Sequence, residues 1–227
     1  MKGIRLFAFF SLILMGASAL RAQTTIYATI LPQHQCLPVQ PTSGPGPNNS
    51  LPEEFGTWNG GASVVAAGFS WHSQHGFDHV NIAAMLGKRH ATITVFLLAD
   101  ENGKIKDSTG ATTTMLQNTI TIPRPTHILP LFERHILFHD LALSPGHYKV
   151  VAFSSDGPIE WETDKGQTFE ARGVTHHGGH TNMTAGTGYT NSVNLSSLSS
   201  TDITPVPNTT ESLCFAVRGV EEVHLVP

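Results

Sequence analysis

The sequence predicts an all-β fold, a single antiparallel β-sandwich with long loops. Short segments rich in β-branched and aromatic residues recur along the chain, and Gly, Asn, Asp and Pro separate them. No segment has a convincing amphipathic helical pattern, and 21 glycines and 14 prolines argue against a helical bundle. The expected strands are Ala62–Trp71, His79–Leu86, Ala91–Leu98, Thr119–Ile122, Ile136–Phe138, His147–Ser154, Ile159–Thr163 and Leu213–Val220.

The middle of the chain predicts hairpins most clearly. Ala91–Leu98 alternates apolar and polar side chains, and Asn102-Gly103 follows it as a turn pair typical of hairpins. Pro145-Gly146 turns the chain into His147–Ser154, a second strongly β-prone segment. These turns favour antiparallel strand pairing.

One segment, Leu129–Leu141, is compatible with either a helix or a strand. A helix would place His135 and His139 one turn apart. We expect a strand, because Pro130 fits only at a helix start and the apolar residues before Leu141 lead into a turn.

Two stretches lack a hydrophobic period. Pro32–Pro52 holds six prolines and predicts an extended linker or surface loop. Val174–Ser200 is rich in Gly, Thr, Ser and Asn and predicts a long loop excursion. Before the first stretch, Gln23–Ile30 is β-prone enough for a short strand.

The first 22 residues predict a secretory signal. Lys2 and Arg5 supply positive charge, and Leu6–Leu14 supplies an apolar core shorter than the roughly 20 residues that span a bilayer. Small residues then precede a cleavage point near Ala22. We expect a secreted or periplasmic protein with no membrane span after processing. The expected organisation is a signal peptide at 1–22, an N-terminal segment with a Pro/Gly-rich linker at 23–55, and a β-sandwich domain at 56–227.

The two cysteines, Cys36 and Cys214, are far apart in the sequence. In an oxidising compartment such an even pair predicts one disulfide, which would tie the N-terminal segment to the last strand. The alternative is two free thiols.

Four segments of the sequence form a recognisable set: Phe138–Tyr148, Asp156–Trp161, Ala171–Thr175 and Leu213–Gly219. Together they resemble the secreted bacterial β-sandwich domains of the choice-of-anchor type, which are common in PEP-CTERM-sorted surface proteins. The resemblance implies a jelly-roll-like sandwich and brings no catalytic residues. The Pro-Glu-Pro motif, apolar span and basic tail of sorted members are absent from this sequence, so we do not expect retention by that route.

Composition excludes one class of partner and suggests another. Thirteen Lys and Arg against 17 Asp and Glu give a net charge of −4, so we expect no nucleic-acid partner. Thirteen histidines are the unusual feature, because imidazole is a common ligand of zinc and similar divalent metals. The candidate metal ligands are His176, His177 and His180 in the Gly-rich stretch, and His72, His75 and His79 around a predicted loop.

The metal hypothesis has a simpler alternative, in which these are solvated loop histidines and no cofactor is bound. His135 and His139 have the spacing of a zinc-protease helix, but Ile136 occupies the position of the glutamate base. Asp78 and Asp140 are candidate oxygen ligands or groups that orient an imidazole.

Aromatic side chains provide the second candidate site. Trp161 and Tyr189 are candidate ligand-binding residues, because a flat apolar ring suits the face of a sugar. In a strand, Trp161 points away from both Glu160 and Glu162, so it serves either as an exposed platform or as a core residue. The two carboxylates share a face and could form a glycosidase-like pair, although a solvated face is the simpler interpretation.

The sequence therefore predicts a secreted, non-enzymatic binding or structural protein, with polysaccharide or a cell-surface matrix as its partner. No nucleophile elbow or dinucleotide-binding fingerprint supports catalysis. The alternative is a His-rich metal-binding protein, with or without metal-dependent hydrolase activity.

Overall fold

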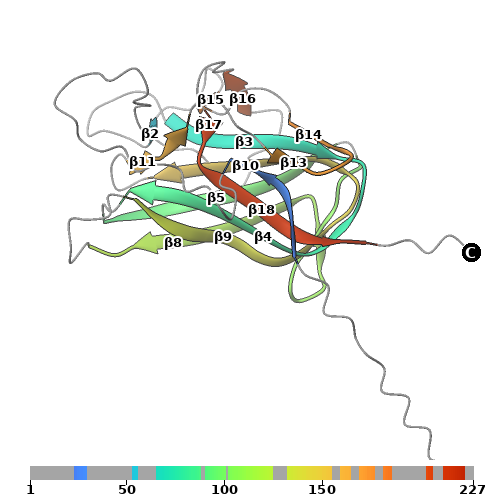
Figure 1. The fold of residues 1–227 in the computed structure, drawn as a ribbon. Helices are drawn as coiled ribbons and strands as arrows, with labels where there is room; N and C mark the ends of the chain where they lie inside the picture. The colour runs from blue at the N-terminus through green and yellow to red at the C-terminus, as the bar shows by residue number, and fades with distance from the viewer. Residues whose placement is uncertain are drawn as a thin grey trace, which may run out of the picture.

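The computed structural model confirms an all-β protein with two antiparallel sheets packed against each other (Figure 1). The part of the chain that it describes contains no helix, and hence none long and apolar enough to cross a membrane. The described residues are 23–29, 53–55, 65–87, 90–100, 102–124, 132–154, 159–164, 169–176, 181–185, 203–206 and 212–222.

The first sheet has nine strands and carries the candidate site described below. Its main path runs β13-β1-β18-β4-β9-β6-β7, and β11 joins β2 to β4. The strands are β1 (Thr24–Ala28), β2 (Glu53–Phe55), β4 (Phe77–Gly87), β6 (Ile105–Lys106), β7 (Thr112–Thr113), β9 (Phe132–Leu143), β11 (Ile159–Trp161), β13 (Phe169–Glu170) and β18 (Phe215–Glu221).

The second sheet has seven strands in the order β16-β15-β3-β10-β5-β8, and β14 pairs with β3. A small two-stranded sheet pairs β12 with β17. In the chain, β12 follows β11 and β17 precedes β18. The strands are β3 (Val65–Ser73), β5 (Ala91–Asp100), β8 (Met115–Ile122), β10 (Gly146–Ser154), β14 (Val174–His176), β15 (Thr181–Ala185) and β16 (Ile203–Val206), with β12 (Thr163–Asp164) and β17 (Ser212–Leu213).

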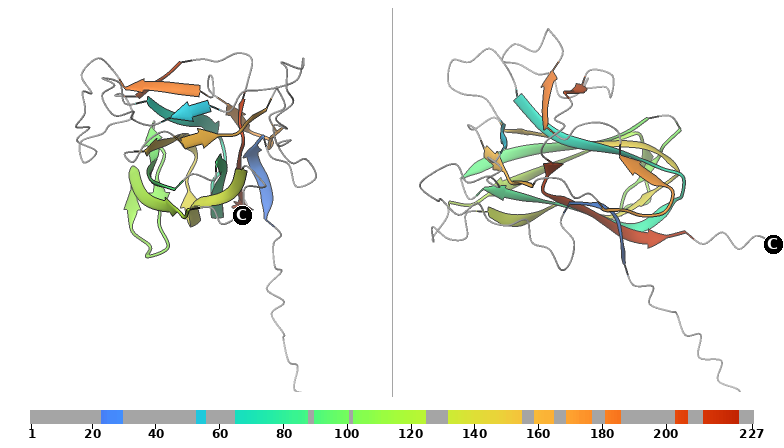
Figure 2. Two further views of the ribbon diagram at one scale, coloured as in Figure 1. Left: turned by 90° about the vertical axis from the view of Figure 1, so that its left-hand side faces the viewer. Right: turned by 45° about the horizontal axis from the view of Figure 1, so that its top comes forward.

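The eight principal strands have the topology of a jelly roll. In chain order they are β1, β3, β4, β5, β8, β9, β10 and β18, and the first pairs with the last, the second with the seventh, the third with the sixth and the fourth with the fifth. This wrapping gives the four-strand orders β1-β18-β4-β9 and β3-β10-β5-β8 in the two sheets, which Figure 2 shows as two layers. The chain therefore crosses between sheets at most of its turns.

Aromatic side chains fill the space between the layers. Phe69 on β3 and Phe215 on β18 stack with ring centroids 3.7 Å apart and planes 8° apart, which joins the two sheets directly. Trp71 stacks on Tyr148 at 5.3 Å, and Tyr27 tilts against Phe215 at 4.7 Å. All five side chains are buried. Each such ring stabilises the fold by roughly 1.5–3 kcal/mol through burial, and each pair adds about 0.5–1.5 kcal/mol.

The two turns predicted from Asn102-Gly103 and Pro145-Gly146 lie against each other. Asn102 has a φ of 73°, the left-handed backbone typical of such a turn. The predicted hairpins are wrong, because β5 and β6 belong to different sheets, and so do β9 and β10. A Cβ on Gly146 would lie 2.4 Å from the Cα of Gly103, so the close approach of two backbones requires glycine there. The N–H of Ser144 donates to the carbonyl oxygen of Lys104 at 3.1 Å and fixes this contact.

Some strands extend beyond the expected ranges. β1 and β2 lie in the segment expected to precede the domain, yet β1 pairs with β18 and β2 pairs with β11, so both belong to the sandwich. The Gly/Thr-rich stretch that predicted only a loop contributes β14 and β15 to the second sheet. Leu129–Leu141 contributes most of strand β9, as we expected, and no helix.

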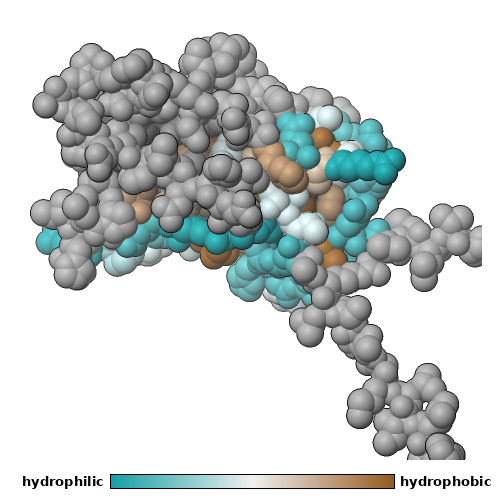
Figure 3. Space-filling view, viewed as in Figure 1, coloured by the Kyte–Doolittle hydropathy of each residue, from teal (hydrophilic) through white to brown (hydrophobic). Residues whose placement is uncertain are grey.

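The described surface is mostly polar. Among the described residues only two large apolar side chains are exposed, Ile136 at 46% and Phe169 at 40%. In the face shown in Figure 3 hydrophilic and neutral residues dominate the described part, with small hydrophobic areas between them. A ligand site on this surface is therefore expected to work through polar groups.

Candidate functional site at the facing bulges of β4 and β9

The pairing of β4 with β9 shifts register at three successive points, and the first two are bulges with the extra residue on opposite strands. Between Phe77 and Val80, β4 has one more residue than β9 has between their partners Leu143 and Leu141. One step further the extra residue is on β9, between Leu141 and Phe138. Bulges of this kind redirect side chains and are common next to functional sites.

His79 and Asp140 occupy these bulges and both have left-handed backbones, with φ of 51° and 53°. Such values are uncommon for residues other than glycine, although His and Asp adopt them more readily than most. Two such residues on neighbouring strands require stabilisation from their surroundings. Strain of this kind concentrates at binding and catalytic sites.

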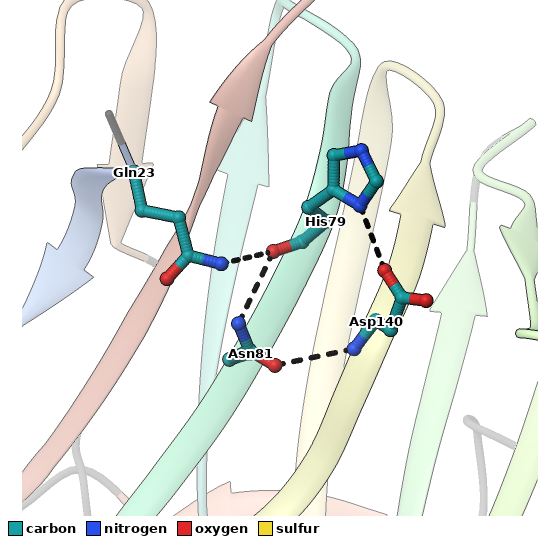
Figure 4. Close-up of polar contacts among 4 residues, drawn as sticks. All are labelled: Gln23, His79, Asn81 and Asp140. Atoms are coloured by element: carbon teal, nitrogen blue, oxygen red, sulfur yellow. Dashed lines mark hydrogen bonds and ion pairs between the residues drawn. The ribbon is translucent and has the colours of Figure 1, made fainter. Parts of the chain in front are cut away.

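Four side-chain hydrogen bonds brace the two bulges (Figure 4). His79 Nδ1 lies 2.8 Å from Asp140 Oδ1, and because a carboxylate only accepts, Nδ1 carries the proton and Nε2 is left for other partners. The Asp140 N–H donates to Asn81 Oδ1 at 3.2 Å. Asn81 Nδ2 and Gln23 Nε2 both donate to the His79 carbonyl oxygen, at 3.3 Å and 2.8 Å. The bulged backbone and the His79–Asp140 pair are therefore held in one arrangement.

The pair lies in an open hollow of about 350 Å³, which we call the β4–β9 hollow. Asp78, His79 and Asp140 line it on the sheet, and the turn Lys106–Gly110 lines it from the β6–β7 hairpin. That hairpin is placed there because Lys106 pairs with Ala142 of β9. The hollow presents carboxylate, imidazole, hydroxyl and ammonium groups together.

Asp107 shapes the wall of the hollow. Its Oδ1 accepts hydrogen bonds from the Thr109 hydroxyl at 2.6 Å, the Thr109 N–H at 2.9 Å and the Ala111 N–H at 3.0 Å. These bonds, led by that from the Thr109 hydroxyl, lower the pKa of the Asp107 carboxyl. Asp107 therefore stays ionised and fixes the turn.

The hydrogen bond to Asp140 raises the pKa of His79 above its usual value, and the negative charges of Asp140 and Asp78 add to the effect. His79 is 69% exposed, so solvent screens the interaction and its contribution to stability is small. The Asp140 carboxylate therefore favours the protonated form of the His79 imidazole.

We expect the His79 imidazole to titrate above the usual 6.5 and to shift back towards that value in Asp140→Asn. Because the folded-state pKa is raised, the stabilising contribution is complete below the unfolded-state pKa and is lost as pH rises through the folded-state pKa. NMR titration of the imidazole Cδ2 and Cε1 protons measures both values. An identical His79 pKa in wild type and Asp140→Asn would contradict the pairing.

The structure separates the histidines that were expected to converge around one loop. The His72 ring lies beside His147 on the second sheet, His75 Nδ1 lies 3.8 Å from Glu221 Oε1, and His79 pairs with Asp140 on the first sheet. Within the described residues, no group of three or more His, Cys, Asp or Glu is arranged to hold a metal ion. The described structure therefore does not bring His72, His75 and His79 together, because β3 and β4 belong to opposite sheets.

Of the two alternatives for Trp161, an exposed platform or a core residue, the structure shows the core residue. Its side chain is fully buried, meets Phe69 edge to face at 6.2 Å, and donates from Nε1 to the Cys214 carbonyl oxygen at 3.0 Å. Glu160 is exposed whereas Glu162 is buried, so the two carboxylates do not share a solvated face. The Trp161 side chain on this strand packs in the core, and the two glutamates do not form a glycosidase-like pair of carboxylates.

Several predicted site residues fall outside the described part of the chain. Tyr189, His177 and His180 are among them, and only the backbone of His176 is described. Cys36 also lies outside, so the Cys36–Cys214 disulfide stays a prediction. The structure describes no free cysteine.

Sequence reasoning named Asp78, His79 and Asp140 without placing them together. The available signal was the pair of motifs Phe77-Asp78-His79-Val80 and Phe138-His139-Asp140-Leu141. In both, two consecutive polar residues interrupt the alternation of a strand, which is the pattern a bulge produces.

Comparison of the chain with family models, with curated proteins and with solved structures gave no match.

Proposed function

We propose that this protein is an exported, non-enzymatic binding protein that takes a hydroxyl-rich ligand, such as a cell-surface polysaccharide or matrix glycan, in the β4–β9 hollow. The observation that carries the proposal is the hydrogen-bonded His79–Asp140 pair, two strained residues on facing bulges inside a polar hollow. The signal-like N-terminus and the resemblance to choice-of-anchor domains support an extracellular location.

The chemistry of the hollow favours hydrogen bonding to hydroxyl groups. Asp140 and Asp78 offer carboxylate acceptors, and Ser108 and Lys106 offer donors. Among the described residues that line the hollow there is no Phe, Tyr or Trp, so we expect polar contacts to hold the ligand. Jelly-roll folds also serve lectins, an analogy of fold that agrees with the proposal.

The same geometry favours binding over catalysis. A His–Asp pair can orient a general base, yet catalysis of that kind is aided by a site that closes and excludes bulk water. His79 is largely exposed in an open hollow, and the Thr109 hydroxyl already donates to Asp107. An open site of this kind is therefore suited to recognising a polymer at the protein surface.

We expect Asp140→Asn and His79→Asn each to weaken polysaccharide binding at least tenfold. Loss of a hydrogen bond to a charged group costs about 1.5–3 kcal/mol, and 1.4 kcal/mol corresponds to a factor of ten. Asparagine tolerates the left-handed backbone at both positions, so the bulges should persist. Affinity electrophoresis of the mature protein against cellulose, chitin, xylan, alginate and peptidoglycan measures the effect.

His75→Gln is the matched control, because it removes an exposed imidazole that also faces a carboxylate but lies outside the hollow. It should bind as the wild type does. Equal retention of wild type, Asp140→Asn and His79→Asn on every polysaccharide that is retained would overturn the proposal. So would a wild type that none of these polysaccharides retains.

A further inference from the structure

A second feature lies on the outer face of the other sheet, where two histidines meet across neighbouring strands. His72 of β3 is directly opposite His147 of β10 in the antiparallel register. Their ring centroids are 4.3 Å apart and the ring planes are tilted by 36°. Their sequence neighbours Trp71 and Tyr148 are buried in the core, so strand alternation turns both imidazoles outward. Figure 1 shows β3 and β10 side by side.

This spacing is close to that of two imidazoles on one metal ion. A zinc–nitrogen distance of about 2.0–2.1 Å and a tetrahedral angle place two coordinating rings with centroids roughly 5 Å apart. The His72 and His147 rings therefore need to separate by less than about 1 Å to share an ion. Both side chains are half-buried on rigid central strands, which limits the freedom they lose on binding.

The neighbouring strands add one acidic group to this row. Asp100 of β5 is opposite His147, and Thr175 of β14 is opposite His72. The Asp100 carboxylate lies 3.5 Å from the Lys149 ammonium group, so these two charges largely offset each other next to the histidine pair.

We propose that His72 and His147 form a binding site for a divalent transition-metal ion of the kind that prefers imidazole nitrogen, Zn²⁺ or Cu²⁺. Two ring nitrogens coordinate the ion, and water fills the remaining positions, because the described residues assemble no third protein ligand. The site is independent of the β4–β9 hollow: it lies on the other sheet and shares no residue with it.

The proposal is tested by titrating untagged mature protein with Cu²⁺ and Zn²⁺, because an affinity tag of histidines would bind both ions. Electron paramagnetic resonance of the Cu²⁺ complex should show coupling to two imidazole nitrogens, and calorimetry with Zn²⁺ should show one site. His72→Gln and His147→Gln should each weaken binding at least tenfold. His75→Gln, which removes an imidazole only three residues from His72, should leave the affinity unchanged.

The contrary results are equally specific. Wild-type affinity in both His72→Gln and His147→Gln would overturn the site, and so would a wild type that binds neither ion. A variant with Asp140→Asn should keep full metal affinity even where it loses polysaccharide. Loss of metal in that variant would contradict the independence of the two sites.

Discussion

Trp161→Ala is expected to lower the free energy of unfolding by about 3–5 kcal/mol, as is usual when a buried aromatic side chain is removed. The side chain has no solvent-exposed surface and packs edge to face against Phe69 across the sandwich. The substitution also removes the hydrogen bond from Nε1 to the Cys214 carbonyl oxygen. For a domain of this size the loss corresponds to a fall of roughly 6–20 °C in melting temperature, measured by calorimetry or circular dichroism.

Two further variants separate packing from the hydrogen bond. Trp161→Phe keeps a ring in the core and loses the N–H donor, so a loss nearer to 1–2 kcal/mol is expected. Glu160→Ala changes the exposed neighbour on the same strand and should lie within about 0.5 kcal/mol of wild type. A melting temperature for Trp161→Ala equal to that of wild type would contradict the core position of this residue.

The regular strands were predictable because their side chains repeat with the period of a pleated sheet. Ala91–Leu98 alternates strongly and forms most of β5, and the β-prone segment His147–Ser154 forms all but the first residue of β10. The first half of β8 was missed, since Met115–Asn118 belongs to the last strand of its sheet and has partly or fully exposed side chains on both faces. Hydrophobic periodicity carries little information for such a strand.

The histidine sites could not be predicted from spacing along the chain. In a jelly roll, consecutive strands often lie in opposite sheets, so His72 on β3 and His79 on β4 diverge although they are close in sequence. The same wrapping brings His147 next to His72 from a distant strand. Proximity in this fold follows from strand pairing, which the sequence alone leaves open.

The orientation of Trp161 was open for a different reason. Strand periodicity states that Trp161 and Glu160 face opposite ways, but not which of them faces the core. Pairing decides this. Trp161 lies opposite Leu86 of β4 and Glu53 of β2, and residues paired in this way share a face of the sheet. Because the Leu86 side chain is buried, Trp161 also faces the core. Burial of the indole then leaves the β4–β9 hollow as the better candidate for ligand recognition.

Cys214→Ala is expected to lower the free energy of unfolding by about 2–5 kcal/mol if Cys214 is paired with Cys36. Cys214 is fully buried immediately before β18, where its N–H donates to the Glu162 carbonyl oxygen at 2.7 Å and its own carbonyl oxygen accepts from the Met85 N–H at 3.0 Å. A disulfide there would anchor the N-terminal segment to a rigid point of the core. The chain-entropy model gives roughly 5 kcal/mol for closing so long a loop.

A double-mutant cycle distinguishes the bridge from simple loss of a buried side chain. With a disulfide, Cys36→Ala, Cys214→Ala and the double variant should all be destabilised to a similar extent, because the first substitution already removes the cross-link. Without a disulfide, Cys36→Ala should be nearly neutral and only Cys214→Ala should destabilise, through the cavity it leaves. Urea denaturation of the four proteins without reductant measures the cycle, and mass spectrometry after alkylation counts the thiols. Two alkylated thiols in the unreduced, unfolded wild type, together with a neutral Cys36→Ala, would exclude the bridge.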